Sequence, residues 1–343
     1  MRVPQIRVLA VLLVCITASV GCNQANNADV SKAQADAEAA RAEAKAARDE
    51  LDKSTAELNA LKAELATLNA TKAAATDERD RKAAEWVLRV GGIVHIVDEG
   101  VNRILPKEGT LPETPFKVTY VNLAEPEVQG KLTNDGVKFL EGLKHLKHLQ
   151  MDLTGVDDFS FVKGMDSLEV FLAAFTDAGL SHLKTLPRIK ILQVGAFFGN
   201  ANITDVGLAH IKELRNLERL DLSGTQITDA GLENLANLNK LQFLDLFRTP
   251  ISDVGLQHLK GLTELRELNM ASTLVTGPGA EHLKGLPKLA SINLQTTKFT
   301  DAGLEHFKGL SNLAGLNVYD TNVTDDGVKA LKAALPNCNI SVK

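Results

Sequence analysis

Five histidines recur at matching positions along the C-terminal part of the chain. Histidine is the commonest metal ligand and the side chain that titrates nearest neutral pH. The five are His182, His210, His258, His282 and His306. If each lies on its own helical element, neighbours are about 10 Å apart, the diameter of a helix, whereas two ligands of one zinc ion each lie about 2 Å from it. We therefore interpret this column as half-exposed packing residues on the outside of the fold, and predict no metal site and no cofactor.

Aspartate also recurs, and we interpret it as structural. Asp205, Asp229, Asp253 and Asp301 each precede a helical stretch, where a carboxylate can cap free N–H groups. At the matching Gly277 the next residue is proline, which is favoured at the first helical position. The sequence contains no nucleophile motif, phosphate loop or paired catalytic carboxylates, and the net charge of −5 argues against nucleic-acid binding. We predict no catalytic residue and a protein that is not an enzyme.

A unit of 24 residues positions these histidines and aspartates. Its copies begin at Asp205, Asp229, Asp253, Gly277, Asp301 and Asp325. In the copy that begins at Asp229, apolar residues are first three apart and then two apart, at Leu244 and Leu246. The first spacing indicates a short helix and the second a strand. Repetition at this period predicts a stack of units rather than a closed enzyme domain.

The pattern Leu217-x-x-Leu220-x-Leu222-x-x-Thr225-x-Ile227 resembles the leucine-rich-repeat signature. Threonine stands where that family usually has Asn or Cys, at Thr154, Thr225, Thr249, Thr273, Thr297 and Thr321. A hydroxyl can serve the same purpose by hydrogen-bonding backbone groups of adjoining loops. The resemblance is to a bacterial class with Thr-Asp-Ala-Gly-Leu starts. It implies an α/β, ribonuclease-inhibitor-like horseshoe with parallel strands on its concave side and short helices on its convex side.

The resemblance covers residues 133–343, which we assign to the leucine-rich-repeat domain. One copy carries four extra residues within 195–202, and residues 157–176 form a shortened copy. Residues 86–132 are less regular, with a turn at Gly91-Gly92 and a candidate strand at 118–123, and we interpret them as the N-terminal cap. The C-terminal LKAALPNCNISVK is expected to form a helix and a closing strand, because the end units of a stack expose apolar faces.

The N-terminus has the features of a targeting segment. Two arginines precede an apolar run from Val8 to Val20, which is too short to span a bilayer comfortably. Small residues then lead directly to Cys22, which resembles a bacterial lipoprotein signal, although Ser19 stands where Leu is usual. The alternative is ordinary signal-peptide cleavage with Cys22 incidental. With three cysteines in all, no disulfide framework is expected.

These features predict where the chain is located. We assign residues 1–21 to a lipoprotein-type signal peptide, Cys22 to lipidation, and residues 22–29 to a polar tether. The chain is then exported and anchored by its lipid in the bacterial cell envelope, facing the periplasm or the surface.

Residues 30–85 lack glycine and proline and are dense in Ala, Glu, Lys and Leu, which predicts an α-helical coiled-coil stalk. Heptad positions a and d hold Ala37, Ala40, Ala44, Ala47, Leu51, Leu58, Leu61, Leu65 and Leu68, with Ser54 as the exception. Acidic g residues would face basic e residues of a parallel partner, as in Glu43–Arg48 and Glu57–Lys62. The two interpretations are a parallel homo-oligomer and a single solvated helix that acts as a spacer.

The strand positions beside the buried leucines face out of the concave sheet. The candidate partner-binding residues there are Asp221, Phe243, Asp245, Phe247, Asn269, Asn293, Asn317 and Tyr319. Their Asp and Asn side chains form an acceptor-rich stripe, and exposed aromatic side chains commonly anchor interfaces. We predict a protein or peptide ligand near Phe243, Asp245 and Phe247. The alternative is that the Asp and Asn side chains merely solvate the sheet.

Three functional hypotheses follow. The first is a non-enzymatic protein–protein interaction module, displayed on the cell envelope through a lipid anchor and a helical stalk. The second is a structural envelope protein that acts mainly through its oligomeric stalk. The third is a carbohydrate-binding or envelope-processing protein that uses the concave stripe.

Overall fold

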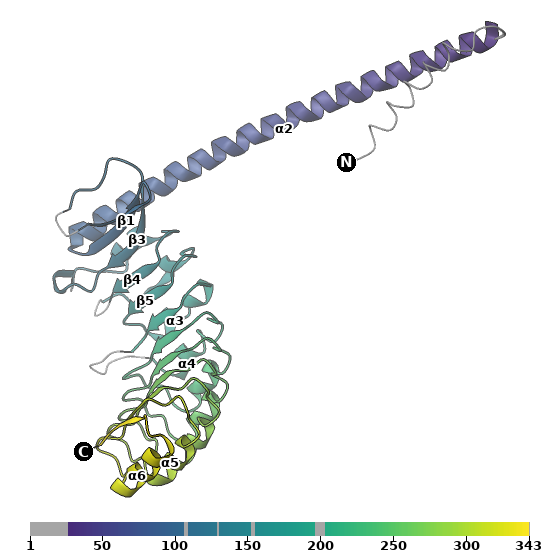
Figure 1. Cartoon of the computed structure of the whole chain (residues 1–343). Helices are drawn as coiled ribbons and strands as arrows, with labels where there is room; N and C mark the ends of the chain where they lie inside the picture. The colour runs from purple at the N-terminus through teal and green to yellow at the C-terminus, as the bar shows by residue number, and fades with distance from the viewer. Residues whose placement is uncertain (1–26, 106–108, 129, 152–154, 196–202, 343) are drawn as a thin grey trace. The chain divides into compact units, whose positions relative to one another are not determined.

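The computed structural model describes residues 27–342 except 106–108, 129, 152–154 and 196–202 (Figure 1). It contains two compact units, one that ends at Ala74 and one that begins at Ala75, and each is described by itself. The predicted signal peptide (1–21), the lipidation site Cys22 and Thr154 lie outside the described residues. No helix in the described part of the chain is both long enough and apolar enough to cross a membrane.

Helix α2 spans Asn27–Val90. It forms because this stretch lacks glycine and proline and is rich in residues of high helix propensity. It begins slightly before and ends slightly after the 30–85 stretch expected from the sequence. It ends where Gly91 adopts a φ of 97°, a conformation that glycine reaches without strain. Within residues 27–74, its large apolar side chains are exposed.

The last turns of α2 and three antiparallel strands form the first layer of the second unit. These strands are β1 (Ile93–Asp98), β2 (Val101–Leu105) and β3 (Phe116–Asn122), with β1 between the other two. Ala83, Trp86 and Val87 of α2 are buried in the core that these strands share with the repeats. Strand β3 confirms the strand expected at 118–123, whereas the β1–β2 hairpin was not anticipated.

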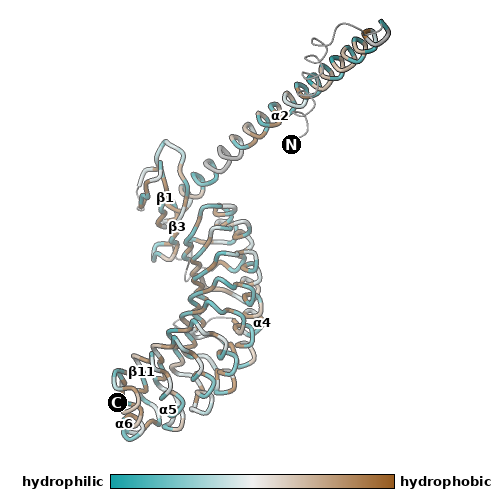
Figure 2. The backbone as a smooth tube through the Cα atoms, turned by 45° about the vertical axis from the view of Figure 1, so that its right-hand side comes forward, coloured by the Kyte–Doolittle hydropathy of each residue, from teal (hydrophilic) through white to brown (hydrophobic). Residues whose placement is uncertain are grey.

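The repeats contribute one strand each to a single sheet of twelve strands. From β3 onward the pairing is parallel and follows the chain. The strands are β4 (His148–Met151), β5 (Val170–Ala173), β6 (Ile191–Gln193), β7 (Arg219–Asp221), β8 (Phe243–Asp245), β9 (Glu267–Asn269), β10 (Ser291–Asn293), β11 (Gly315–Asn317) and β12 (Asn339–Ser341). Successive coils lie side by side along this sheet (Figure 1), and apolar and polar stretches alternate along them (Figure 2).

The side of each coil opposite the strands is helical, and most of its segments are 3₁₀ rather than α. The α-helices are α3 (Asp177–Leu180), α4 (Asp205–Leu208), α5 (Asp301–Phe307) and α6 (Asp325–Ala334). The 3₁₀ segments are η1 (Pro126–Val128), η2 (Gly136–Leu140), η3 (Ser160–Val162), η4 (Leu183–Thr185), η5 (Gly231–Leu235), η6 (Gly255–Leu259) and η7 (Pro278–His282). The physical reason is the three-residue spacing of the apolar side chains, because a 3₁₀ helix has three residues per turn and places them on one face. The final α6 and β12 confirm the helix and strand expected at the C-terminus.

The aspartates at the repeat starts join adjacent units, which corrects the prediction that each caps its own helix. Asp229 accepts the backbone N–H of Ser252 at 2.8 Å on one carboxylate oxygen and the Ser252 hydroxyl on the other. The same pair of bonds joins Asp177 to Thr204, Asp205 to Thr228 and Asp301 to Thr324. In α3, α4 and α6 the capping residue is instead the Thr before the aspartate, as where the Thr324 hydroxyl accepts the Gly327 N–H.

This link also explains the glycine near the start of the next unit at Gly207, Gly231, Gly255 and Gly327. A Cβ atom at Gly255 would lie 2.5 Å from the carboxylate oxygen of Asp229, and one at Gly231 would lie 2.2 Å from that of Asp205. The glycine therefore makes room for the carboxylate of the preceding unit. Where Gly277 replaces the aspartate, the Thr300 N–H donates directly to the Thr276 carbonyl at 3.1 Å. Pro278 lies at the start of η7, as expected.

The threonine column closes the turn that follows each strand. The hydroxyl of Thr249 is buried and donates to the Leu246 carbonyl three residues earlier at 2.6 Å. The same bond is made by Thr225, Thr273, Thr297 and Thr321. The column is structural, as predicted, but its partner lies in the same repeat rather than in an adjoining loop.

Candidate functional site

The last residues of strands β7 to β11 form one continuous column on the outward side of the sheet. The parallel register pairs Asp221 with Asp245, Asp245 with Asn269, and then Asn269, Asn293 and Asn317 in turn. All five side chains are half-buried. The strand pairing therefore brings together the acidic and amide stripe that the sequence predicted.

Each side chain of this stripe has a structural bond at the end of its strand. One side-chain oxygen accepts the backbone N–H two residues later, at 2.8–3.1 Å. The pairs are Asp221–Ser223, Asp245–Phe247, Asn269–Ala271, Asn293–Gln295 and Asn317–Tyr319. Because Asp and Asn both offer this acceptor, they can alternate in the column. The stripe thus does more than solvate the sheet, and only the second polar atom of each side chain is free to differ between repeats.

Those second atoms make the two ends of the stripe chemically different. The Asn269 amide donates to both carboxylate oxygens of Asp245 at 3.0 Å, and the Asn317 amide donates to Gln295 at 3.2 Å. Asp221 lies directly beside Asp245. Burial, together with the negative charge of Asp221, raises the pKa of the Asp245 carboxyl, against the opposing effect of its two hydrogen-bond donors. The Asp221–Asp245 end carries the carboxylates of the stripe, whereas the other end carries neutral amides, so the negative charge lies at the Asp221–Asp245 end.

The aromatic candidates differ in how far they are available. The guanidinium of Arg219 stacks over the ring of Phe243 at 4.0 Å, so this face of the ring is already covered. Phe247 has the guanidinium of Arg248 5.3 Å from its ring centre and is half-buried. Tyr319 is 50% exposed. Tyr319 is thus better suited to contact a partner than Phe243.

A hollow of about 410 Å³ lies over the centre of the stripe. Its lining includes Gln193, Asp221, Ser223, Asp245, Phe247, Asn269, Ala271, Ser272, Asn293 and Gln295. Five predicted residues thus meet there, namely Asp221, Asp245, Phe247, Asn269 and Asn293. The other three, Phe243, Asn317 and Tyr319, are not part of its lining. The neighbouring Ser272 and Gln295 were not singled out from the sequence.

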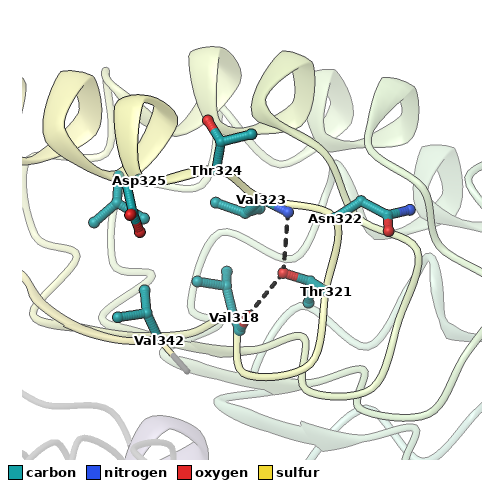
Figure 3. A pocket seen from close by; sticks show the side chains of 8 residues that line it. Val318, Thr321, Asn322, Val323, Thr324, Asp325 and Val342 are labelled. Atoms are coloured by element: carbon teal, nitrogen blue, oxygen red, sulfur yellow. Dashed lines mark hydrogen bonds between the residues drawn. The ribbon is translucent and has the colours of Figure 1, made fainter.

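A second hollow, of about 500 Å³, lies at the C-terminal end of the stack (Figure 3). Val318, Val323, Val328 and Val342 line it together with polar residues of the last turn. The equivalent positions of an internal repeat are fully buried, because the following unit covers them. Among the described residues, this hollow is therefore the face of the last repeat against which no further unit packs.

A ring stack at the other end of the sheet was not foreseen. Tyr120 of β3 lies between His95 of β1 and His148 of β4, with ring centres 4.0 and 4.5 Å away. Burial lowers the pKa of both histidines, and the neighbouring His95 lowers that of His148 further. Among the described residues, the buried Nε2 of His148 has no hydrogen-bond partner. The stack depends on the antiparallel pairing of β1 with β3, which the repeat pattern does not encode.

The five histidines of the repeat column are half-buried in the helical segments or at their ends, which agrees with their interpretation as packing residues. His282 lies 3.8 Å from the carboxylate of Glu281. Within the described ranges, no group of three or more His, Cys, Asp or Glu side chains is arranged to hold a metal ion.

Comparison with known proteins agrees with this geometry. Residues 215–261 match the family model described as Leucine Rich repeats (2 copies). The repeat domain is a leucine-rich-repeat solenoid. Solved structures that resemble it include an internalin C2 from Listeria monocytogenes, with 25% identity, 62% of this chain and 84% of that chain covered, and a TM-score of 0.48. A second internalin of the same organism has 20% identity, coverages of 60% and 76%, and a TM-score of 0.35. No curated protein matches the chain.

Proposed function

We propose that this leucine-rich-repeat domain binds a protein partner on its concave sheet, over the hollow lined by Asp221, Asp245 and Phe247. The observation that carries the proposal is that hollow, in which carboxylate, amide and aromatic side chains from successive strands face one surface. Extended concave surfaces of this kind are the binding surfaces of solenoid proteins. Its acceptor-rich lining suits a polypeptide segment that supplies hydrogen-bond donors, and Phe247 provides an apolar contact beside them.

The N-terminal segments complete this proposal. In it, residues 1–21 direct export, Cys22 carries the lipid, and the helix of residues 27–74 separates the anchor from the repeat domain in a bacterial envelope. The support for the anchor is the apolar run that leads to Cys22, and the support for the stalk is the exposure of the α2 leucines within residues 51–68. The domain is then an interaction module and not an enzyme.

The test is capture of envelope proteins by the full chain, compared with a variant of the hollow. Asp245→Asn combined with Phe247→Ala keeps the acceptor for the backbone N–H of residue 247 and removes the charge and the ring. His258→Ala on the helical side is the matched control. We expect wild type and His258→Ala to capture the same partner, identified by mass spectrometry, and the double variant to lose it. Capture of one and the same set by all three chains would show that the partner does not use this surface.

A further inference from the structure

The large apolar side chains of residues 27–74 all lie on one stripe of α2. They are Val30, Leu51, Leu58, Leu61, Leu65 and Leu68, and each is 44–65% exposed. Every one of them occupies position a or d of a single heptad register, and the segment contains no other Val, Leu, Ile, Met or Phe. A lone solvated spacer has no need for this restriction, whereas the seam of a coiled coil requires it.

We propose that this stripe binds a second copy of the chain, forming a parallel, in-register coiled coil over residues 51–68. The helix that presents the stripe is continuous through these residues. The alanines at a and d from residue 37 to 47 continue the seam towards the N-terminus, where they bury less apolar surface. The inference concerns the stalk alone and does not depend on what the concave sheet binds.

Charge complementarity sets the orientation of the two helices. The g positions are acidic in five successive heptads, at Asp36, Glu43, Glu50, Glu57 and Glu64. The e positions hold Arg41, Arg48 and Lys62, with Thr55 and Asn69 at the other two. In a parallel pair each g residue faces the e residue five positions later on its partner, which opposes Glu57 to Lys62. In an antiparallel pair g faces g, so that carboxylates would oppose carboxylates.

Three of the charges at these positions have no counter-charge within reach along their own helix. Glu43, Lys62 and Glu64 have no oppositely charged residue three or four positions away along the helix. Among the side chains described in residues 27–71, no ion pair forms. A partner helix supplies the missing counter-charges, for instance Glu57 of one copy for Lys62 of the other.

The distribution of leucines sets the register. In register, Leu51, Leu58, Leu61, Leu65 and Leu68 each meet their own copy, which gives five leucine layers. A shift of one heptad leaves three, because Leu51 then meets Ala44 and Leu61 meets Ser54. Ser54 at a d position meets another Ser54 only in register.

Two repeat domains then belong to one assembly, so a multivalent partner is bound with avidity.

Sedimentation equilibrium of the full chain in density-matched detergent tests the association. We expect at least twice the monomer mass at micromolar concentration, and monomer mass for the triple variant Leu58→Ala, Leu61→Ala, Leu65→Ala. Alanine retains helix propensity, and circular dichroism verifies the helix. Lys62→Glu is expected to raise the dissociation constant about tenfold, through two interchain repulsions, and adding Glu57→Lys is expected to restore it.

Disulfide formation tests the orientation and the register. Leu61→Cys is expected to yield a cross-linked pair on oxidation in excess of the wild-type background, whereas Ala56→Cys on the outer face is not. A monomeric wild-type chain overturns the proposal. So does association that survives the triple alanine variant, or cross-linking at residue 56 but not at residue 61. Partner capture by a monomeric chain would leave the proposed binding function standing while the stalk inference fails.

Discussion

The carboxylate of Asp229 fills the space left by Gly255 of the next repeat, and this arrangement predicts a result that ordinary packing does not. Asp229 accepts two hydrogen bonds from Ser252 of the next repeat, and a Cβ at Gly255 would lie 2.5 Å from its carboxylate oxygen. Gly255→Ala must therefore displace the carboxylate. Asp229→Ala removes it outright. The two substitutions damage one and the same contact, so their costs in unfolding free energy should not add.

The magnitude follows from the bonds lost. Hydrogen bonds to a charged group contribute about 1.5–3 kcal/mol each, and the partly exposed position favours the lower end, so Asp229→Ala is expected to cost about 3 kcal/mol. Gly255→Ala loses the same bonds and regains about 0.5–1 kcal/mol from the better helix former, for a net cost of about 2 kcal/mol. The double variant loses these bonds once and keeps the helix-propensity gain, so it is expected to cost about 2 kcal/mol rather than the sum of about 5.

The measurement is urea unfolding followed by the fluorescence of Trp86, the only tryptophan of the chain and buried in its core. Hydrogen exchange of the Ser252 amide gives a local readout, and it should accelerate to the same extent in both single variants. In the Asp229→Ala background, the nearest remaining atom to a Cβ at residue 255 is a methyl carbon of Leu232 at 3.1 Å, so the neighbour has to shift by only a few tenths of an ångström. Single-variant costs that add to within about 0.5 kcal/mol would refute the shared contact.

Three further predictions concern titration and the turns. Burial raises the pKa of Asp245, so its charged form destabilises the fold near neutral pH. Asp245→Asn should therefore raise the melting temperature at pH 7, and this gain should fade as the pH falls through the raised pKa. A gain of equal size at pH 3 would contradict this. Burial lowers the pKa of His95 and His148, so stability should fall as the pH drops below about 6.5, the unfolded-state value. His148→Phe keeps a ring against Tyr120 and should flatten the dependence of the melting temperature on pH between 7.5 and 5. An unchanged slope would show that the ring stack is not the source of this pH dependence. Thr249→Val removes the 2.6 Å hydroxyl bond to the Leu246 carbonyl, which keeps the backbone N–H of Thr249 at 3.2 Å, and should cost about 1 kcal/mol in urea unfolding. Thr249→Ser should recover most of this cost, and equal losses in both variants would point to packing instead.

The fold could be predicted from the sequence because each position of the repeat is in the same environment, buried or exposed, in every copy. Leu244 and Leu246, spaced by two, are both buried in and after strand β8. The absence of helix breakers gave the long helix, and Gly91 ended it. The three-residue spacing also held the information for the 3₁₀ segments, although it was interpreted as a helix without its type.

The candidate site was only partly accessible. The register of the parallel strands assembles the Asp and Asn stripe, and the repeat period implies that register. The covering of Phe243 by Arg219 was not predictable, because it depends on side-chain rotamers of two adjacent strands. The lining of the hollow by Ser272 and Gln295 likewise depends on the loops that follow the strands.

By itself, the sequence determined the period, the identity of the buried positions, the stripe on the strands and the heptad register of α2, because all of these are local spacings along one chain. Only the tertiary structure decided which atoms meet across repeats. Asp229 contacts Ser252 and not its own helix, and His95 stacks on Tyr120, because such contacts are set by how one coil or strand is offset against the next. That offset results from the packing of whole units, and no single repeat contains it.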